Sequence, residues 1–103
     1  MAYTDSSEFK IPRHIVAKNG VNIESISANK TLTYSDSQYQ RLDAQSTSLE
    51  CILPAEKDGA WFVINCQGNA IDVKDADGVR VKLLSVGEGG LFACDGSSWK
   101  QFI

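Results

Sequence analysis

The sequence predicts an all-β protein: a single antiparallel β-sandwich, or a small β-barrel or tulip-like domain, preceded by an extended N-terminal arm. Three observations support this fold class. No stretch of about a dozen residues repeats apolar side chains at the three- and four-residue spacing of an amphipathic helix. Residues that favour turns interrupt the chain about every eight to twelve positions, which is typical of short strands in all-β domains. The 103 residues are 43% hydrophobic and 22% charged, which fits one globular domain with one core.

Residues 1–20 are expected to form the arm, and residues 21–103 the β-domain. Residues 1–8 are polar and indicate a tail, whereas Phe9, Ile11, Ile15 and Val16 would form an adhesive apolar patch in free solution. We therefore expect these four side chains to pack on their own domain or on a neighbour. The start of the chain lacks the apolar core of a signal peptide, and no apolar run is long enough to cross a membrane. These features predict a soluble protein that is not exported.

Nine short strands are expected in the β-domain, because short runs that are apolar or alternate between apolar and polar residues lie there between turn residues. They span residues 21–26, 31–34, 38–43, 49–53, 61–66, 70–73, 79–86, 90–94 and 98–102. Five segments between apolar runs offer residues that tolerate positive φ. These are Asp58-Gly59, Gln67-Gly68-Asn69, Asp77-Gly78, Gly87-Glu88-Gly89 and Asp95-Gly96. Several antiparallel hairpins are expected from them.

Side-chain alternation sorts the faces of two strands. In the strand at 61–66, one face holds Phe62, Ile64 and Cys66, and the other holds Trp61, Val63 and Asn65. Both faces are largely apolar, which predicts a central strand covered by a second sheet on one side and by a loop, the arm or a partner subunit on the other. In the strand at 79–86, apolar residues that should border the core alternate with basic ones that should face water. The apolar set is Val79, Val81 and Leu83, and the basic set is Arg80 and Lys82.

The residue types do not indicate an enzyme, a metal site or a cofactor. His14 is the only histidine, which leaves no histidine-dependent triad and at most one histidine ligand for a metal. Cys51, Cys66 and Cys94 are odd in number, widely spaced and flanked by apolar strand residues, which indicates reduced core thiols and synthesis in a reducing cytoplasm. The net charge of −3 gives no electrostatic reason to expect nucleic-acid binding.

One acidic segment superficially resembles a helix-loop-helix calcium loop, because Asp75 and Asp77 precede Gly78. However, Val73 and Leu84 stand where the first and last carboxylate ligands should be. Aspartate stabilises turns by accepting hydrogen bonds from nearby backbone groups. The sequence therefore predicts a hairpin turn at this segment rather than a metal site.

Several short motifs follow one another in a fixed order between residues 28 and 102. They are Thr31-Leu32-Thr33, Leu42-Asp43, Ile52-Leu53-Pro54, Gly59-Ala60-Trp61-Phe62-Val63-Ile64-Asn65, Gly68-Asn69-Ala70-Ile71, Asp77-Gly78, Gly87-Glu88 and Cys94-Asp95-Gly96-Ser97-Ser98-Trp99. With a Leu-Pro step, a Gly-x-x-Phe strand and a terminal Cys-Asp-Gly-x-x-Trp hairpin in this order, the chain resembles small all-β virion proteins and fibre domains of tailed bacteriophages. The resemblance covers about three quarters of the chain.

Within this class, a short chain without a coiled coil, a collagen-like repeat or a long shaft is most similar to a capsid decoration, or cement, protein. The resemblance implies a compact β-domain, commonly a homotrimer, on the virion surface. It would be made in the host cytoplasm and would clamp neighbouring subunits of the major capsid protein on the outside of the assembled head. Nucleic acid, membrane and cofactor are not among its expected partners.

An arm that orders on docking is typical of such proteins, so the resemblance places the capsid-binding residues in the arm. They are Phe9, Lys10, Ile11, Pro12, Arg13, His14 and Ile15. The apolar members would supply buried area, and the basic members would pair with acidic capsid groups. Trp61 and Trp99 are candidate subunit contacts. The alternative function is a tail-fibre or tail-tip adhesin module that binds a bacterial surface glycan, because exposed aromatic rings can stack on sugars.

Overall fold

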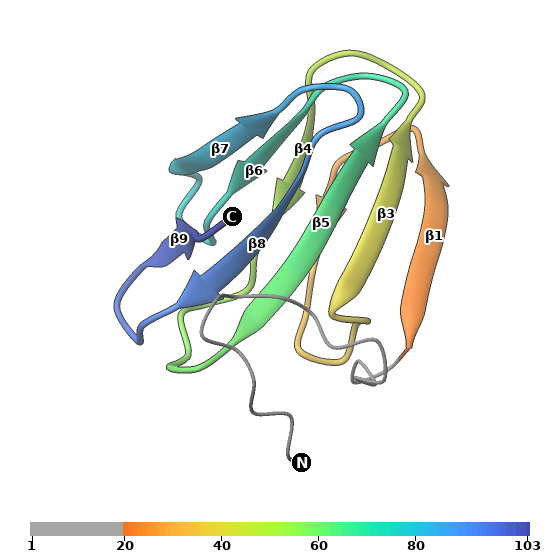
Figure 1. The fold of residues 1–103 in the computed structure, drawn as a ribbon. Helices are drawn as coiled ribbons and strands as arrows, with labels where there is room; N and C mark the ends of the chain where they lie inside the picture. The colour runs from red at the N-terminus through yellow and green to blue at the C-terminus, as the bar shows by residue number, and fades with distance from the viewer. Residues whose placement is uncertain (1–19) are drawn as a thin grey trace.

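The computed structural model describes residues 20–103. The predicted capsid-binding residues of the arm therefore lie outside the described residues. Residues 20–103 contain nine strands and no helix, which confirms the all-β class (Figure 1). The strands are β1 (Val21–Ile26), β2 (Lys30–Thr31), β3 (Tyr39–Ala44), β4 (Leu49–Ile52), β5 (Trp61–Gln67), β6 (Ile71–Lys74), β7 (Arg80–Leu84), β8 (Gly89–Cys94) and β9 (Trp99–Gln101).

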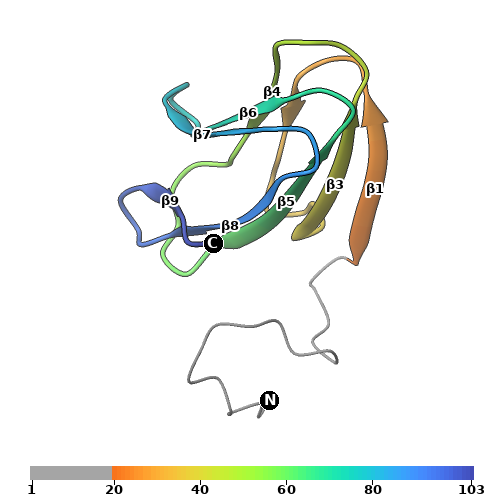
Figure 2. The ribbon, with the colours of Figure 1, turned by 45° about the horizontal axis from the view of Figure 1, so that its top comes forward.

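The strands form two sheets that face each other (Figures 1 and 2). The first sheet has five strands in the order β1-β3-β5-β8-β9, and the second has four in the order β2-β4-β6-β7. Each predicted strand overlaps one observed strand. β2 is shorter than expected because the chain turns directly after it, where the N–H of Thr33 donates to Asp36 Oδ2 at 2.7 Å.

The predicted antiparallel architecture is wrong, because both sheets are mixed. In the five-stranded sheet β1, β3 and β5 run parallel, and in the four-stranded sheet β2, β4 and β6 do so. The physical reason is the path of the chain, which alternates between the two sheets from β1 to β6. Each strand of one sheet thus serves as the crossover between two parallel neighbours of the other, a role that a helix plays in α/β proteins.

Only two of the five predicted turns close hairpins within one sheet. Asp77-Gly78 joins β6 to β7, and Asp95-Gly96 joins β8 to β9. The other three connect strands of different sheets, although each of them also contains a glycine with a positive φ. Gly59, Gly68 and Gly87 all have φ near +80°, as the predicted turns require.

The core lies between the two sheets and draws on both of them. Phe62, Ile64 and Cys66 of β5 point into it and are buried, as the alternation predicts. From the facing sheet come side chains such as Cys51 and Val73, which have no exposed surface. The inner face therefore consists of tightly packed apolar residues contributed by strands that are far apart in sequence.

The predicted faces of β7 are only partly correct. Val79 and Leu83 are 61% and 43% exposed, whereas Leu84 is fully buried and Val81 packs against the core. The cause is an irregularity in the β6–β7 ladder, where consecutive residues of β6 pair with Lys82 and Arg80 and skip the residue between them. A bulge of this kind shifts the alternation of buried and exposed side chains by one residue, and no pattern in the sequence predicts it.

Candidate functional site

The outer face of the five-stranded sheet carries an apolar surface. One row crosses four strands, because Val21 pairs with Tyr39, Tyr39 with Val63, and Val63 with Leu91. The next positions on this face add two further side chains. We call the whole set the apolar face: Val21, Ile23, Tyr39, Trp61, Val63 and Leu91. Val21 and Ile23 are 66% and 73% exposed, and the other four are half-buried.

Two aromatic rings contact each other in the apolar face. Tyr39 and Trp61 meet edge to face, with ring centroids 5.9 Å apart and an interplanar angle of 81°. Partial burial raises the pKa of the Tyr39 hydroxyl. An apolar surface with aromatic residues at its centre has the composition that protein interfaces favour.

The outer face of the four-stranded sheet has the opposite character. Lys74 Nζ lies 2.6 Å from Glu50 Oε2, and Arg80 holds Asp72 through two hydrogen bonds of 2.9 and 3.0 Å. These ion pairs raise the pKa values of Lys74 and Arg80, chiefly through the hydrogen bonds to their carboxylate partners. Ion pairs at a wet surface add little stability but keep that surface hydrated. The two outer faces of the molecule therefore differ in the partners they suit.

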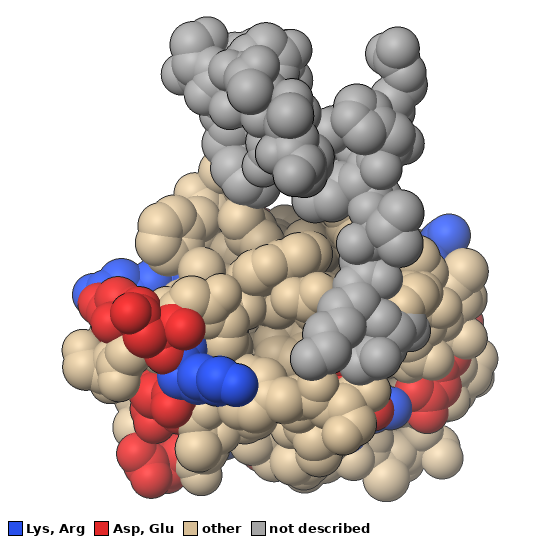
Figure 3. All heavy atoms as spheres, turned by 90° about the horizontal axis from the view of Figure 1, so that it is seen from below, with Lys and Arg blue, Asp and Glu red and all other residues tan. Residues whose placement is uncertain are grey.

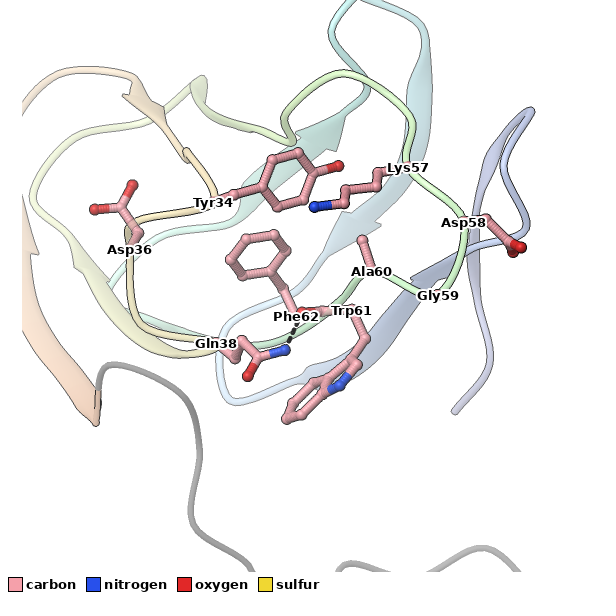
Figure 4. A pocket seen from close by; sticks show the side chains of 9 residues that line it. All are labelled: Tyr34, Asp36, Gln38, Lys57, Asp58, Gly59, Ala60, Trp61 and Phe62. Atoms are coloured by element: carbon pink, nitrogen blue, oxygen red, sulfur yellow. Dashed lines mark hydrogen bonds between the residues drawn. The ribbon is translucent and has the colours of Figure 1, made fainter.

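An aromatic pocket opens at the end of the molecule where β3 and β5 begin (Figure 4). It encloses about 190 Å³ and is lined by rings of Tyr34, Trp61 and Phe62, with Gln38 and Lys57 beside them. The Tyr34 and Phe62 rings stack at 6.4 Å, and the Lys57 ammonium lies 5.3 Å from the centroid of the Tyr34 ring. Burial raises the pKa of Tyr34, whose hydroxyl donates to the carbonyl of Ala55.

The charged groups around this pocket differ in whether they face its aromatic rings. The Lys57 side chain lies along the Tyr34 ring, whereas the carboxylates of Asp36 and Asp58 point away from the rings (Figure 4). Figure 3 shows the same end of the molecule, where residues without charge form most of the visible centre and charged ones gather toward the margins. The pocket thus offers flat rings, one ammonium group and one amide, a set of groups that suits a sugar ring better than a metal ion.

Three carboxylates come together at the β6–β7 turn. Oxygens of Glu56, Asp75 and Asp77 all lie within 4.8 Å of one another. Asp75 Oδ1 already accepts the backbone N–H groups of Asp77 and Val79, each at 2.9 Å, and Gly78 has a φ of +85°. These contacts are those of the predicted turn. The position of the Asp75 carboxylate is therefore explained by the turn, without a metal ion.

The three cysteines are buried, as predicted, and are not paired with one another. Burial raises the pKa of Cys51 to about 12 and also raises that of Cys66. Such thiols are poor nucleophiles and poor metal ligands, because both roles need the thiolate. The cysteines therefore belong to the core and not to a reactive site.

The two tryptophans predicted as candidate contacts lie in different environments. Trp61 is half-buried and belongs both to the apolar face and to the aromatic pocket. Trp99 is only 5% exposed and packs in the core, with its ring 6.0 Å from that of Phe62. Side-chain alternation indicated Val63 and Trp61 as outward residues, but the other four members of the apolar face were not predicted: Val21, Ile23, Tyr39 and Leu91. Alternation along β1, β3 and β8 was the signal that could have located them.

No helix that could cross a membrane occurs in the part of the chain that the structure describes. Comparisons of the chain with protein-family models, with curated proteins and with solved structures return no match.

Proposed function

We propose that this protein is a capsid decoration protein of a tailed bacteriophage, a β-sandwich that binds the outside of the assembled head and clamps neighbouring major capsid protein subunits. The observation that supports this proposal best is the contrast between the two outer faces. The apolar face presents Tyr39, Trp61 and Val63 on neighbouring strands, while the opposite face carries the ion pairs Lys74–Glu50 and Arg80–Asp72. A protein that lies flat on a shell needs one adhesive face and one hydrated face.

The proposed mechanism is binding and not catalysis. A protein that binds the assembled shell but not its separated subunits stabilises the shell by mass action, and many copies make a small contribution large. The predicted arm residues, Phe9 to Ile15, would extend the contact across subunit boundaries at the entropic cost of ordering a segment. The homotrimer that the resemblance implies stays a prediction.

The test compares binding to mature shells with binding to dissociated capsid subunits, measured by co-sedimentation and by electron microscopy of the pelleted particles. We expect stoichiometric binding to shells and none to free subunits. Val63→Lys, in the middle of the apolar face, should reduce shell binding at least tenfold. Leu83→Lys is the matched control, because it adds the same charge to the opposite sheet at an exposed apolar position.

Two results would contradict the proposal. One is equal binding of wild type to shells and to free subunits, or to neither. The other is an equal loss for the two lysine variants, because the apolar face would then have no special role.

The aromatic pocket favours a second candidate, an adhesin module that binds a bacterial surface glycan. Lys57, Tyr34 and Trp61 offer an ammonium group and stacking rings, which suit an acidic sugar. Lys57→Ala distinguishes the two functions, because Lys57 lines the pocket and is not part of the apolar face. Surface polysaccharide binding in wild type that disappears in this variant, with shell binding absent from both proteins, would favour the adhesin.

A further inference from the structure

Among residues 20–103, strand β1 is an edge of the five-stranded sheet (Figure 1). It pairs with β3 on one side only, in an uninterrupted parallel register over all six of its residues. The carbonyl of Ile26 accepts the N–H of Gln45, at 2.8 Å, and Ile26 pairs with Ala44. In a parallel ladder this means that Ile26 turns its backbone groups toward β3, and so do Glu24 and Asn22, two and four residues earlier.

The intervening residues must then turn their N–H and C=O groups away from β3. These are Val21, Ile23 and Ser25, so three donors and three acceptors line the outer edge of β1. Among residues 20–103, none hydrogen-bonds to them. The side chains of Val21 and Ile23 are also the two most exposed large apolar groups in the described part of the chain.

Within residues 20–103, the other sheet edges have the protection that folded proteins normally provide, and β1 does not. β2 has two residues, β9 has three, and β7 is interrupted by its bulge. β1 has six residues and contains neither a proline nor a bulge. A flat edge with apolar side chains is a template for pairing with another strand.

We propose that β1 pairs antiparallel with β1 of a second copy of this chain, about a two-fold axis at Ile23. In this register Ile23 faces Ile23 of the second copy, and Val21 faces Ser25 of the second copy. All three outward residues of each strand then form hydrogen-bonded pairs, and the two five-stranded sheets become one continuous sheet.

The charge of Glu24 and the number of paired outward residues favour this register over its neighbours. With the axis at Ile23, each Glu24 faces Asn22 of the second copy. Sliding the strands so that the axis falls on Glu24 would set two carboxylates directly opposite each other, which is destabilising. A slide in either direction, with the axis on Asn22 or on Glu24, would leave two outward residues per strand paired in place of three. Within one chain, Glu24 accepts hydrogen bonds from Asn22 and Lys30, each at 2.9 Å.

This inference does not rest on the proposed function, and it concerns an edge rather than the middle of the apolar face. A two-fold contact uses the same surface on both molecules and closes with two chains. The two-fold dimer is an alternative to the homotrimer that the resemblance implies, and the sedimentation of the wild type decides between them.

Cysteine cross-linking tests both the contact and its register. Opposed residues of a hydrogen-bonded antiparallel pair have Cα atoms about 5.5 Å apart, within the range of a disulfide. Ile23→Cys should therefore form an interchain disulfide when the purified protein is oxidised in air with copper phenanthroline. Val21→Cys is the matched control, because the two Val21 positions would lie roughly 14 Å apart along the strands. The three natural cysteines are buried and should not react.

A second variant tests the hydrogen bonds. Proline at position 23 removes an outward N–H and leaves the β1–β3 ladder intact. We expect wild type to sediment as a dimer at micromolar concentration and Ile23→Pro to sediment as a monomer with an unchanged circular dichroism spectrum. A monomeric or trimeric wild type, failure of Ile23→Cys to cross-link, or equal cross-linking of Val21→Cys would each overturn the proposal. The cysteine variants decide the question if Ile23→Pro does not fold.

Discussion

The indole N–H of Trp99 donates a hydrogen bond of 2.9 Å to the backbone carbonyl of Pro54, which lies 45 residues earlier in the chain. Trp99 opens β9 at the end of the five-stranded sheet, and Pro54 follows β4 of the four-stranded sheet. The hydrogen bond therefore ties the C-terminal hairpin to the opposite layer. It makes Trp99 a structural residue of the core.

Replacing Trp99 by Phe should destabilise the protein, because an aromatic ring remains while the Pro54 carbonyl loses its donor. We expect a loss of about 1 kcal/mol in the free energy of unfolding, plus the packing lost with the smaller ring. Urea unfolding followed by circular dichroism measures it. Trp61→Phe is the control, because within residues 20–103 the Trp61 indole N–H makes no hydrogen bond. Equal losses for the two variants would contradict a special role for the Trp99 hydrogen bond.

Gly68 and Gly78 should differ in their tolerance of alanine, although both have positive φ. A Cβ at Gly78 meets open space, so Gly78→Ala should cost only the backbone strain, about 1–2 kcal/mol. A Cβ at Gly68 would collide with the backbone oxygen of Ala44 and with the Asp43 carboxylate, which adds about 1–3 kcal/mol. Thermal and urea unfolding of both variants check the ranking. A Gly68→Ala protein as stable as Gly78→Ala would show that the β5–β6 turn is looser than described.

The stability contribution of Asp95 should depend on pH. Its Oδ1 accepts the backbone N–H groups of Ser97 and Ser98 and the Ser97 hydroxyl, and these bonds lower its pKa from 3.8 to about 2. Because the pKa is lower in the folded state, the contribution is complete above the unfolded value and disappears as the pH falls through the folded one. Asp95→Asn mimics the protonated group.

The difference in melting temperature between wild type and Asp95→Asn should therefore be constant above about pH 5, shrink as the pH falls, and vanish below about pH 2. Asp77→Asn is the control, because the Asp77 carboxylate accepts no hydrogen bond within the described part of the chain. A difference for Asp95→Asn that is the same at pH 2 and pH 6 would contradict the turn's dependence on the ionised carboxylate.

The sequence was sufficient to locate the strands but not to pair them. Alternation of Phe62, Ile64 and Cys66 with outward residues is a local property, so it predicted β5 and its buried face correctly. A glycine turn looks the same whether it joins neighbours in one sheet or strands in opposite sheets. Gly68 and Gly78 are both turn glycines, yet only Gly78 closes a hairpin. The antiparallel prediction failed for this reason.

The candidate sites were predictable to different degrees. The central part of the apolar face follows from the same alternation that buries Phe62, because Trp61 and Val63 must point the other way. The aromatic pocket depends on a contact between Lys57 and Tyr34, which lie in separate connections between strands. The conformation of such connections is set by tertiary packing, so no spacing in the sequence brings these two residues together.

The three thiols should resist alkylation as long as the protein is folded. Cys51 is fully buried with a pKa raised to about 12, burial raises the pKa of Cys66, and Cys94 is 4% exposed. Iodoacetamide attacks the thiolate, and at pH 8 a group with that pKa is ionised in only about one molecule in ten thousand. Mass spectrometry after treatment should show an unmodified chain in buffer and three added groups in guanidinium chloride. Val86→Cys, at a position that is 58% exposed, should gain one group in buffer and so shows that the reagent is active. Rapid modification of a natural cysteine in buffer would mean that the two sheets separate often enough to expose the core.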